Sequence, residues 1–160
     1  MSVDLEAVVR SRFADGPPNG WLERWDVDRF SEELKALARP DRLSNLTSFD
    51  DAFGNTYKVA IEPGRTGSTL SLTIKISFIA DAFCLYWQST GRNGTPRRLA
   101  PGEPDGAGRP LEERIRAFFA RRAFVEVSAA EFGRPIEVVA TELGESDRVT
   151  LGQCLFDDHA

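Results

Sequence analysis

The clearest pattern in the chain is the alternation of apolar and polar residues from Thr69 to Ile79. Apolar side chains recur at every second position, which is the period of a β-strand with one buried face. Two further segments alternate in the same way, residues 56–62 (TYKVAIE) before this run and residues 82–88 (AFCLYWQ) after it. Because short turn-forming segments separate the three runs, the pattern predicts a three-stranded antiparallel meander.

One face of this predicted meander is polar. An antiparallel sheet can leave such a face open to water or to a partner, but a second layer can also cover it, and the sequence leaves both readings open. Tyr86 lies near the middle of the face, where an aromatic residue is a typical interface anchor. The residues predicted to share the polar face are Lys58, Ser71, Thr73, Lys75, Ser77, Cys84, Tyr86 and Gln88.

Apolar residues at helical spacing predict three helices. The first runs from Leu5 to about Phe13, and the turn-forming segment DGPPNG ends it. A second is expected after Asp26, a suitable N-cap, and ends before Pro40. The third opens at Pro110. Its predicted buried stripe consists of Leu111, Ile115, Phe118 and Phe119.

The rest of the carboxy-terminal half is predicted in short pieces. Residues 124–127 favour a strand, 128–132 a turn of helix, 136–141 an extended segment and 148–156 (RVTLGQCLF) a closing strand. Residues 89–110 are rich in Gly and Pro and are expected to form a long exposed loop. The fold class is therefore predicted as α+β, with a mostly antiparallel sheet and helices packed on one face.

Length and composition are those of one globular domain covering residues 1–160. The amino terminus carries acids and lacks a basic leader, and no run approaches the ~20 apolar residues that span a bilayer. The two cysteines, Cys84 and Cys154, lie in apolar runs and are expected to be buried, reduced thiols. These features favour a cytoplasmic protein that does not enter a membrane.

Candidate chemistry is sparse. The one histidine is His159 at the carboxy-terminal end, so nucleophilic catalysis with a histidine base and a mixed Cys/His zinc site are both disfavoured. The segment GRTGS at residues 64–68 lacks a phosphate-loop pattern and is interpreted as a hairpin turn. Adjacent carboxylates at Asp50/Asp51 and Asp157/Asp158 are more typical of solvated turns than of a metal site. We therefore expect no catalytic residue, metal or cofactor.

Charge is distributed unevenly along the chain. The formal net charge is −5, but residues 92–122 contain eight Arg against four acids, which leaves +4 there and −9 elsewhere. A mostly acidic surface disfavours nucleic-acid binding and favours encounter with a basic partner. The arginine-rich segment supports an alternative, a domain that binds a small ligand, an anion or a nucleic acid. The helical part of that segment also fits an ordinary solvated face balanced by Glu112 and Glu113.

The carboxy-terminal half resembles bacterial immunity proteins of polymorphic toxin systems. The resemblance covers about residues 55–158 and consists of the aromatic strand SFIADAFCLYW, a covering helix, the segment FVEVSAAEFGRPIEVVATEL and the ending TLGQCLFDD. It implies a small, acidic, cytosolic protein without catalytic residues that blocks a cognate toxin by covering its active site or locking its fold. It transfers no functional residue.

These observations together predict a non-enzymatic protein-binding protein, most concretely an immunity protein that neutralises a basic toxin domain by direct binding. An acidic surface would speed encounter and a few anchors would set the lifetime of the complex. The sequence does not indicate an oligomeric state. The predicted partner-binding residues are Tyr86, Asp50, Asp51, Glu142, Glu145, Asp147, Asp157 and Asp158.

Overall fold

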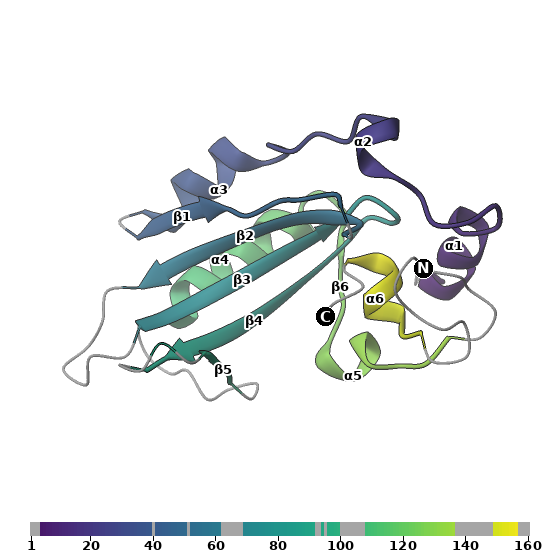
Figure 1. Cartoon of the computed structure of the whole chain (residues 1–160). Coiled ribbons are helices and arrows are strands. Elements are labelled where there is room, and N and C mark those ends of the chain that lie inside the picture. The colour runs from purple at the N-terminus through teal and green to yellow at the C-terminus, as the bar shows by residue number, and fades with distance from the viewer. Residues whose placement is uncertain are drawn as a thin grey trace.

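A computed structural model describes residues 4–39, 41–50, 52–61, 69–91, 94, 96–99, 108–136 and 149–156. The described strands form one six-stranded sheet in the order β1-β2-β3-β4-β5, with β6 beside β4 (Figure 1). The strands are β1 (Arg42–Asn45), β2 (Gly54–Ile61), β3 (Thr69–Ser77), β4 (Ala82–Thr90), β5 (Pro96–Arg98) and β6 (Val125–Glu126). The helices are α1 (Leu5–Arg12), α2 (Gly20–Glu23), α3 (Ser31–Ala38), α4 (Arg109–Ala120), α5 (Ala129–Phe132) and α6 (Leu151–Leu155).

The predicted meander is confirmed as β2, β3 and β4. All neighbours from β1 to β5 pair antiparallel, and only the short β4–β6 pair among the described strands is parallel. Helices combined with a mostly antiparallel sheet make the protein α+β, as predicted. Strand β1 was not predicted, since its four residues RLSN are largely exposed and show no alternation.

The apolar face of the meander packs against α3 and α4, which lie along one side of the sheet in Figure 1. The predicted stripe of α4 is buried in this core together with the apolar residues of the strands. A second apolar cluster lies at the end of the sheet where β3 turns into β4, and there α1, α5 and α6 gather (Figure 1). Cys84 belongs to this second cluster, so helices also contact the opposite face of β4.

The polar face of the meander is covered where β3 crosses it. Ser71, Thr73, Lys75 and Ser77 are each at most 5% exposed. Tyr86 is half-buried and so remains partly accessible on the neighbouring strand. The sequence left open whether this face is free or covered. The face is covered along β3 and at Cys84, while Lys58, Tyr86 and Gln88 on the neighbouring strands remain partly accessible.

The second predicted helix starts later than expected. Asp26 does not cap it, because α3 begins at Ser31 and Asp26 instead accepts the Asp28 amide in a turn. A short helix, α2, precedes this turn and is capped by the side chain of Asn19. Phe30, directly before α3, has a left-handed backbone with φ of 66°, which reverses the chain between the turn and the helix.

The prediction of a closing strand at residues 148–156 is wrong, because this segment forms helix α6. The Thr150 side chain accepts the Gln153 amide at 3.2 Å, and the Gln153 side chain accepts the Thr150 amide at 2.9 Å. This reciprocal capping box satisfies two amides at the start of the helix and so favours helix over strand. Thr150 retains one isolated antiparallel bridge, to Pro135.

The segment predicted as a loop at residues 89–110 contains regular structure at both ends and in the middle. Ser89 and Thr90 extend β4, Pro96–Arg98 pair with them as β5, and α4 begins at Arg109. The strand predicted at 124–127 and the turn of helix predicted at 128–132 are observed as β6 and α5. Of the extended segment expected at 136–141, only Ile136 lies within the described residues.

Candidate functional site

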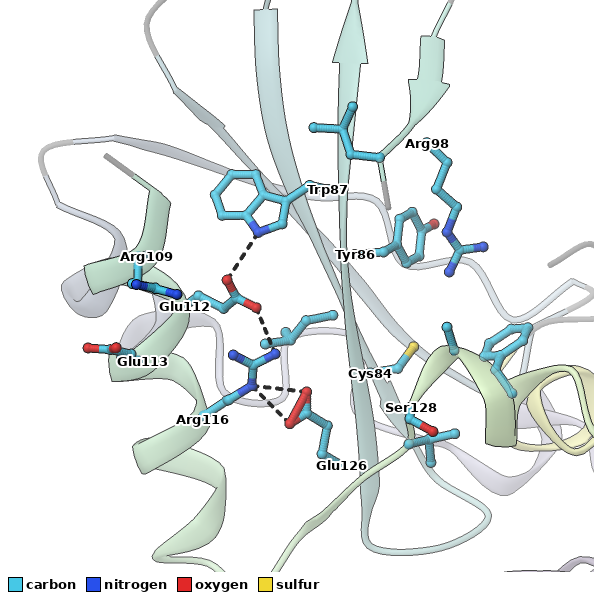
Figure 2. A pocket seen from close by; sticks show the side chains of 15 residues that line it. Cys84, Tyr86, Trp87, Arg98, Arg109, Glu112, Glu113, Arg116, Glu126 and Ser128 are labelled. Carbon is cyan, nitrogen blue, oxygen red and sulfur yellow. Dashed lines mark hydrogen bonds and ion pairs between the residues drawn. The ribbon is translucent and has the colours of Figure 1, made fainter. Parts of the chain in front are cut away.

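A hollow of about 510 Å³ lies along the outer edge of β4. Its walls are the middle of β4, the end of β5, the first two turns of α4, and the segment that joins β6 to α5. Figure 2 shows Tyr86 and Trp87 on opposite sides of β4, so the hollow reaches around the strand edge from one face of the sheet to the other. Such concave sites with a few convergent polar groups are the usual places where proteins bind ligands.

Arg116 organises the charged wall of the hollow (Figure 2). Its Nε lies 2.9 and 3.0 Å from the two carboxylate oxygens of Glu126, and its Nη2 lies 2.6 Å from Oε1 of Glu112. Hydrogen bonding to Glu126, followed by the charges of Glu126 and Glu112, raises the pKa of Arg116 despite partial desolvation. Because Trp87 Nε1 donates to Glu112 at 3.3 Å, this network links β4, α4 and β6.

The opposite wall is aromatic. The guanidinium carbon of Arg98, on β5, lies 4.0 Å from the centre of the Tyr86 ring and 5.9 Å from that of Phe132. This stacking holds the guanidinium over the ring by cation–π attraction. Neither Arg98 nor Arg109 has a carboxylate partner among the described residues, so both retain donors for an incoming group.

Cys84 lines the base of the hollow but is not a reactive thiol. Its side chain is 3% exposed, and burial raises the pKa of this thiol to about 12. Lys75 and Arg98 oppose the shift electrostatically without cancelling it. Since the thiolate is the nucleophilic form of cysteine, the Cys84 side chain stays protonated and inert at neutral pH.

We expect the ionisation of Cys84 to make stability depend on alkaline pH. The unfolded thiol loses its proton near pH 9 and the folded thiol only near pH 12, so the unfolded state binds fewer protons between these values. The free energy of unfolding should fall over this window by up to about 4 kcal/mol. Urea denaturation of the wild type and Cys84→Ala at several pH values isolates the contribution. A difference between the two proteins that stays constant from pH 8 to 12 would contradict the assignment.

The structure separates the predicted partner-binding residues. Tyr86 lines the hollow. Asp50 does not line it and instead accepts a hydrogen bond from Trp21 Nε1 at 3.0 Å, beside α2. The other predicted contacts lie outside the described residues, and they are Asp51, Glu142, Glu145, Asp147, Asp157 and Asp158.

Sequence reasoning missed most of the hollow. Glu112 and Arg116 are four residues apart on a predicted helix, so their ion pair was readable from the spacing. Glu126 joins them only because β6 pairs parallel with the start of β4, which no local pattern indicated. Arg98 was noted within the arginine-rich segment, but its place over Tyr86 depends on β5, which was assigned to a loop.

A scan against protein-family models found no match, and searches of curated proteins and of solved structures found none either. Among the described residues, no helix is long and apolar enough to cross a membrane. Within the same part of the chain, no three His, Cys, Asp or Glu side chains are grouped so that they could hold a metal ion.

Proposed function

We propose that this chain is a non-enzymatic protein-binding protein and that the hollow beside β4 is its main contact site. In its most specific form, which the sequence resemblance suggests, it is an immunity protein that neutralises a cognate toxin in the bacterial cytoplasm. The observation that carries the proposal is the Tyr86–Arg98 stack at the rim of a concave, partly apolar site. Tyrosine, tryptophan and arginine are the residue types that dominate binding energy at protein interfaces.

Preorganisation of the site supports binding. Arg116 is fixed by two carboxylates, and the indole of Trp87 is fixed by Glu112 and by contact with the backbone at Gly108. A methyl group on Gly108 would lie 2.7 Å from the Trp87 ring, so a larger residue there would displace the indole. Side chains that are already held in place lose little conformational entropy when a partner docks.

The groups in the hollow favour binding over catalysis. The Cys84 thiol is protonated at neutral pH, and Glu112 and Glu126 are both bound to Arg116. A general base or nucleophile needs a free lone pair aimed at the substrate, which these pairings disfavour. Three Arg and three Glu line the hollow, so its formal charge is balanced. The acidic surface expected to speed encounter with a basic partner therefore has to lie elsewhere on the molecule.

We expect loss of the Tyr86–Arg98 stack to reduce capture of the partner at least tenfold. Tagged wild-type protein and the double variant Tyr86→Ala/Arg98→Ala would be used in parallel pull-downs from a lysate of the source bacterium, with quantitative mass spectrometry. The amount of a stoichiometrically captured protein should fall at least tenfold with the variant, because truncation of one interface anchor costs about 2 kcal/mol or more of binding free energy. Co-expression of the captured protein with each form then tests whether binding relieves its toxicity.

The matched control is Trp21→Ala/Arg24→Ala, which removes an exposed aromatic residue of α2 and the exposed arginine that caps the end of this helix, both outside the hollow. It should capture the same protein at the wild-type level. Equal capture by all three forms, or capture lost only in the α2 control, would show that the hollow is not the contact site. A captured protein whose toxicity is unaffected would leave protein binding in place but refute the immunity role.

A second candidate function is the binding of a small anionic ligand. It is favoured by Arg98 and Arg109, which line the same hollow without a carboxylate partner among the described residues. Guanidinium groups suit carboxylates and phosphates because they donate two parallel hydrogen bonds. This candidate replaces the first if the pull-down yields no protein and inorganic phosphate raises the melting temperature of the wild type but not of the double variant.

A further inference from the structure

The outer edge of β4 pairs with described strands at its two ends but not in its middle. At one end β5 pairs with Gln88–Thr90, and the Leu99 amide donates to the Trp87 carbonyl at 2.9 Å. At the other end β6 pairs with Ala82 and Phe83, and the Val127 amide donates to the Phe83 carbonyl at 2.8 Å. The two carbonyls are four positions apart along β4, which corresponds to about 13 Å of strand at ~3.3 Å per residue.

Leu85 lies at the centre of this gap. Along a β-strand, alternate residues direct their backbone groups to the same edge. Because Phe83 and Trp87 hydrogen-bond outward, the N–H and C=O of Leu85 also point outward, away from β3. Neither group has a hydrogen-bond partner among the described residues. Within the described part of the chain, the wall of the hollow therefore presents one unsatisfied backbone donor and one unsatisfied backbone acceptor.

A free donor and acceptor on a strand edge are complementary to another extended main chain, which carries the same two groups at the same spacing. Side chains of an added segment would alternate between the two sides of β4. On one side they would meet Tyr86 and Arg98, and on the other Trp87 and the α4 wall (Figure 2). A small ligand would use only part of these groups.

The charges around the gap indicate which side chain the added segment carries. Glu112 and Glu126 both pair with Arg116, whereas Arg98 is held over Tyr86 with no carboxylate partner among the described residues. A carboxylate placed over the Tyr86 side would complete a charge-assisted pair with Arg98. A basic side chain there would face the positive charge of the Arg98 guanidinium instead.

We propose that the gap in the β4 edge binds a short extended peptide segment, which hydrogen-bonds to the backbone of Leu85 and places an Asp or Glu side chain against Arg98. This inference rests on the proposed function and specifies how the partner protein docks: an extended segment, acidic at one position, adds a strand between β5 and β6. The partner as a whole can still be basic, because only one side chain of the segment meets Arg98.

The test uses a phage-displayed library of random linear heptapeptides selected on the wild-type protein, followed by fluorescence anisotropy with the enriched peptides. We expect enriched sequences to share one acidic position. Their affinity should fall at least tenfold for Leu85→Pro relative to Leu85→Ala. Both variants lose the leucine side chain, but only proline removes the outward N–H, which is not part of the β3–β4 ladder.

Two further measurements keep the test valid if Leu85→Pro does not fold. N-methylation of the peptide at the residue facing Leu85 should weaken binding at least tenfold, since it removes the donor to the Leu85 carbonyl. Selection on Arg98→Glu should enrich basic instead of acidic residues at the same position. Failure to enrich any peptide would overturn the inference. So would peptide affinities that change with neither N-methylation nor Leu85→Pro.

The outcomes separate this inference from the proposed function. A partner captured through the Tyr86–Arg98 stack, in the absence of any enriched peptide, would show that the hollow binds a folded surface. Enriched peptides displaced by millimolar inorganic phosphate, yet insensitive to N-methylation, would show that Arg98 binds an anion and that the strand edge takes no part. Both results refute strand addition without removing the hollow as a site.

Discussion

Replacement of Arg29 by methionine is expected to lower the free energy of unfolding by about 2–4 kcal/mol, because it leaves buried acceptors without donors. The Arg29 guanidinium donates to Asn55 Oδ1 at 3.1 Å and to the carbonyls of Ile76 and Ser77 at 3.2 and 2.9 Å. It also stacks on the Phe78 ring at 3.6 Å. The Arg29 side chain thus links the segment between α2 and α3 to the start of β2 and the end of β3 by hydrogen bonds.

The electrostatic environment of Arg29 supports this structural role. Burial lowers the pKa of its guanidinium to about 10, and the nearby carboxylate of Asp81 opposes the shift. The backbone of the same residue accepts a hydrogen bond from Tyr57 Oη at 2.7 Å. Desolvation of a charge is unfavourable unless several hydrogen bonds replace water, and the three acceptors around Arg29 provide them.

Urea denaturation followed by tryptophan fluorescence would measure the effect of Arg29→Met. The matched control is Arg39→Met, at an exposed arginine after α3, which should change the free energy of unfolding by less than about 0.5 kcal/mol. Arg29→Lys should recover little, because a single ammonium cannot reproduce the planar fork that reaches three acceptors. Similar stabilities for Arg29→Met and Arg39→Met would mean that the network contributes nothing to folding.

The sequence predicted the strands and helices that are indicated by residue spacing within a single segment. Alternation located the three strands of the meander, and the spacing of Leu111, Ile115, Phe118 and Phe119 located α4 and its buried face. Helix α6 was missed because Val149, Leu151 and Leu155 fit a strand about as well as a helix, and the capping box at Thr150 was overlooked. In that segment a pair of local hydrogen bonds outweighed the hydrophobic pattern.

The candidate site was predictable only in part, because most of its geometry is not local. Tyr86 was found from the alternation of β4, and it lines the hollow. The cluster around Arg116 depends on β6 returning beside the start of β4, and the Arg98 stack depends on a three-residue strand. The gap at Leu85 exists only because β5 and β6 each cover a different end of one strand. No period in the sequence specifies that arrangement.

Replacement of Phe119 by alanine is expected to lower the free energy of unfolding by about 3–5 kcal/mol. Phe119 is fully buried on α4. Its ring stacks on Phe83 with centroids 4.5 Å apart and contacts three more phenylalanine rings, from Phe30, Phe118 and Phe124. Truncation leaves a cavity between α4 and the sheet and removes these aromatic contacts.

The destabilisation caused by Phe119→Ala should also affect the hollow, because α4 carries the charged residues of its wall. Loosening of α4 would displace Glu112 and Arg116 from β4 and β6, so binding of an enriched peptide should weaken in parallel with stability. Leu22→Ala is the control, since this leucine is 83% exposed and its truncation should change stability by less than about 0.5 kcal/mol. Thermal and urea denaturation of both variants, followed by anisotropy at a temperature where each is folded, would separate the two effects. Full peptide affinity in a destabilised Phe119→Ala protein would show that the hollow does not depend on the packing of α4.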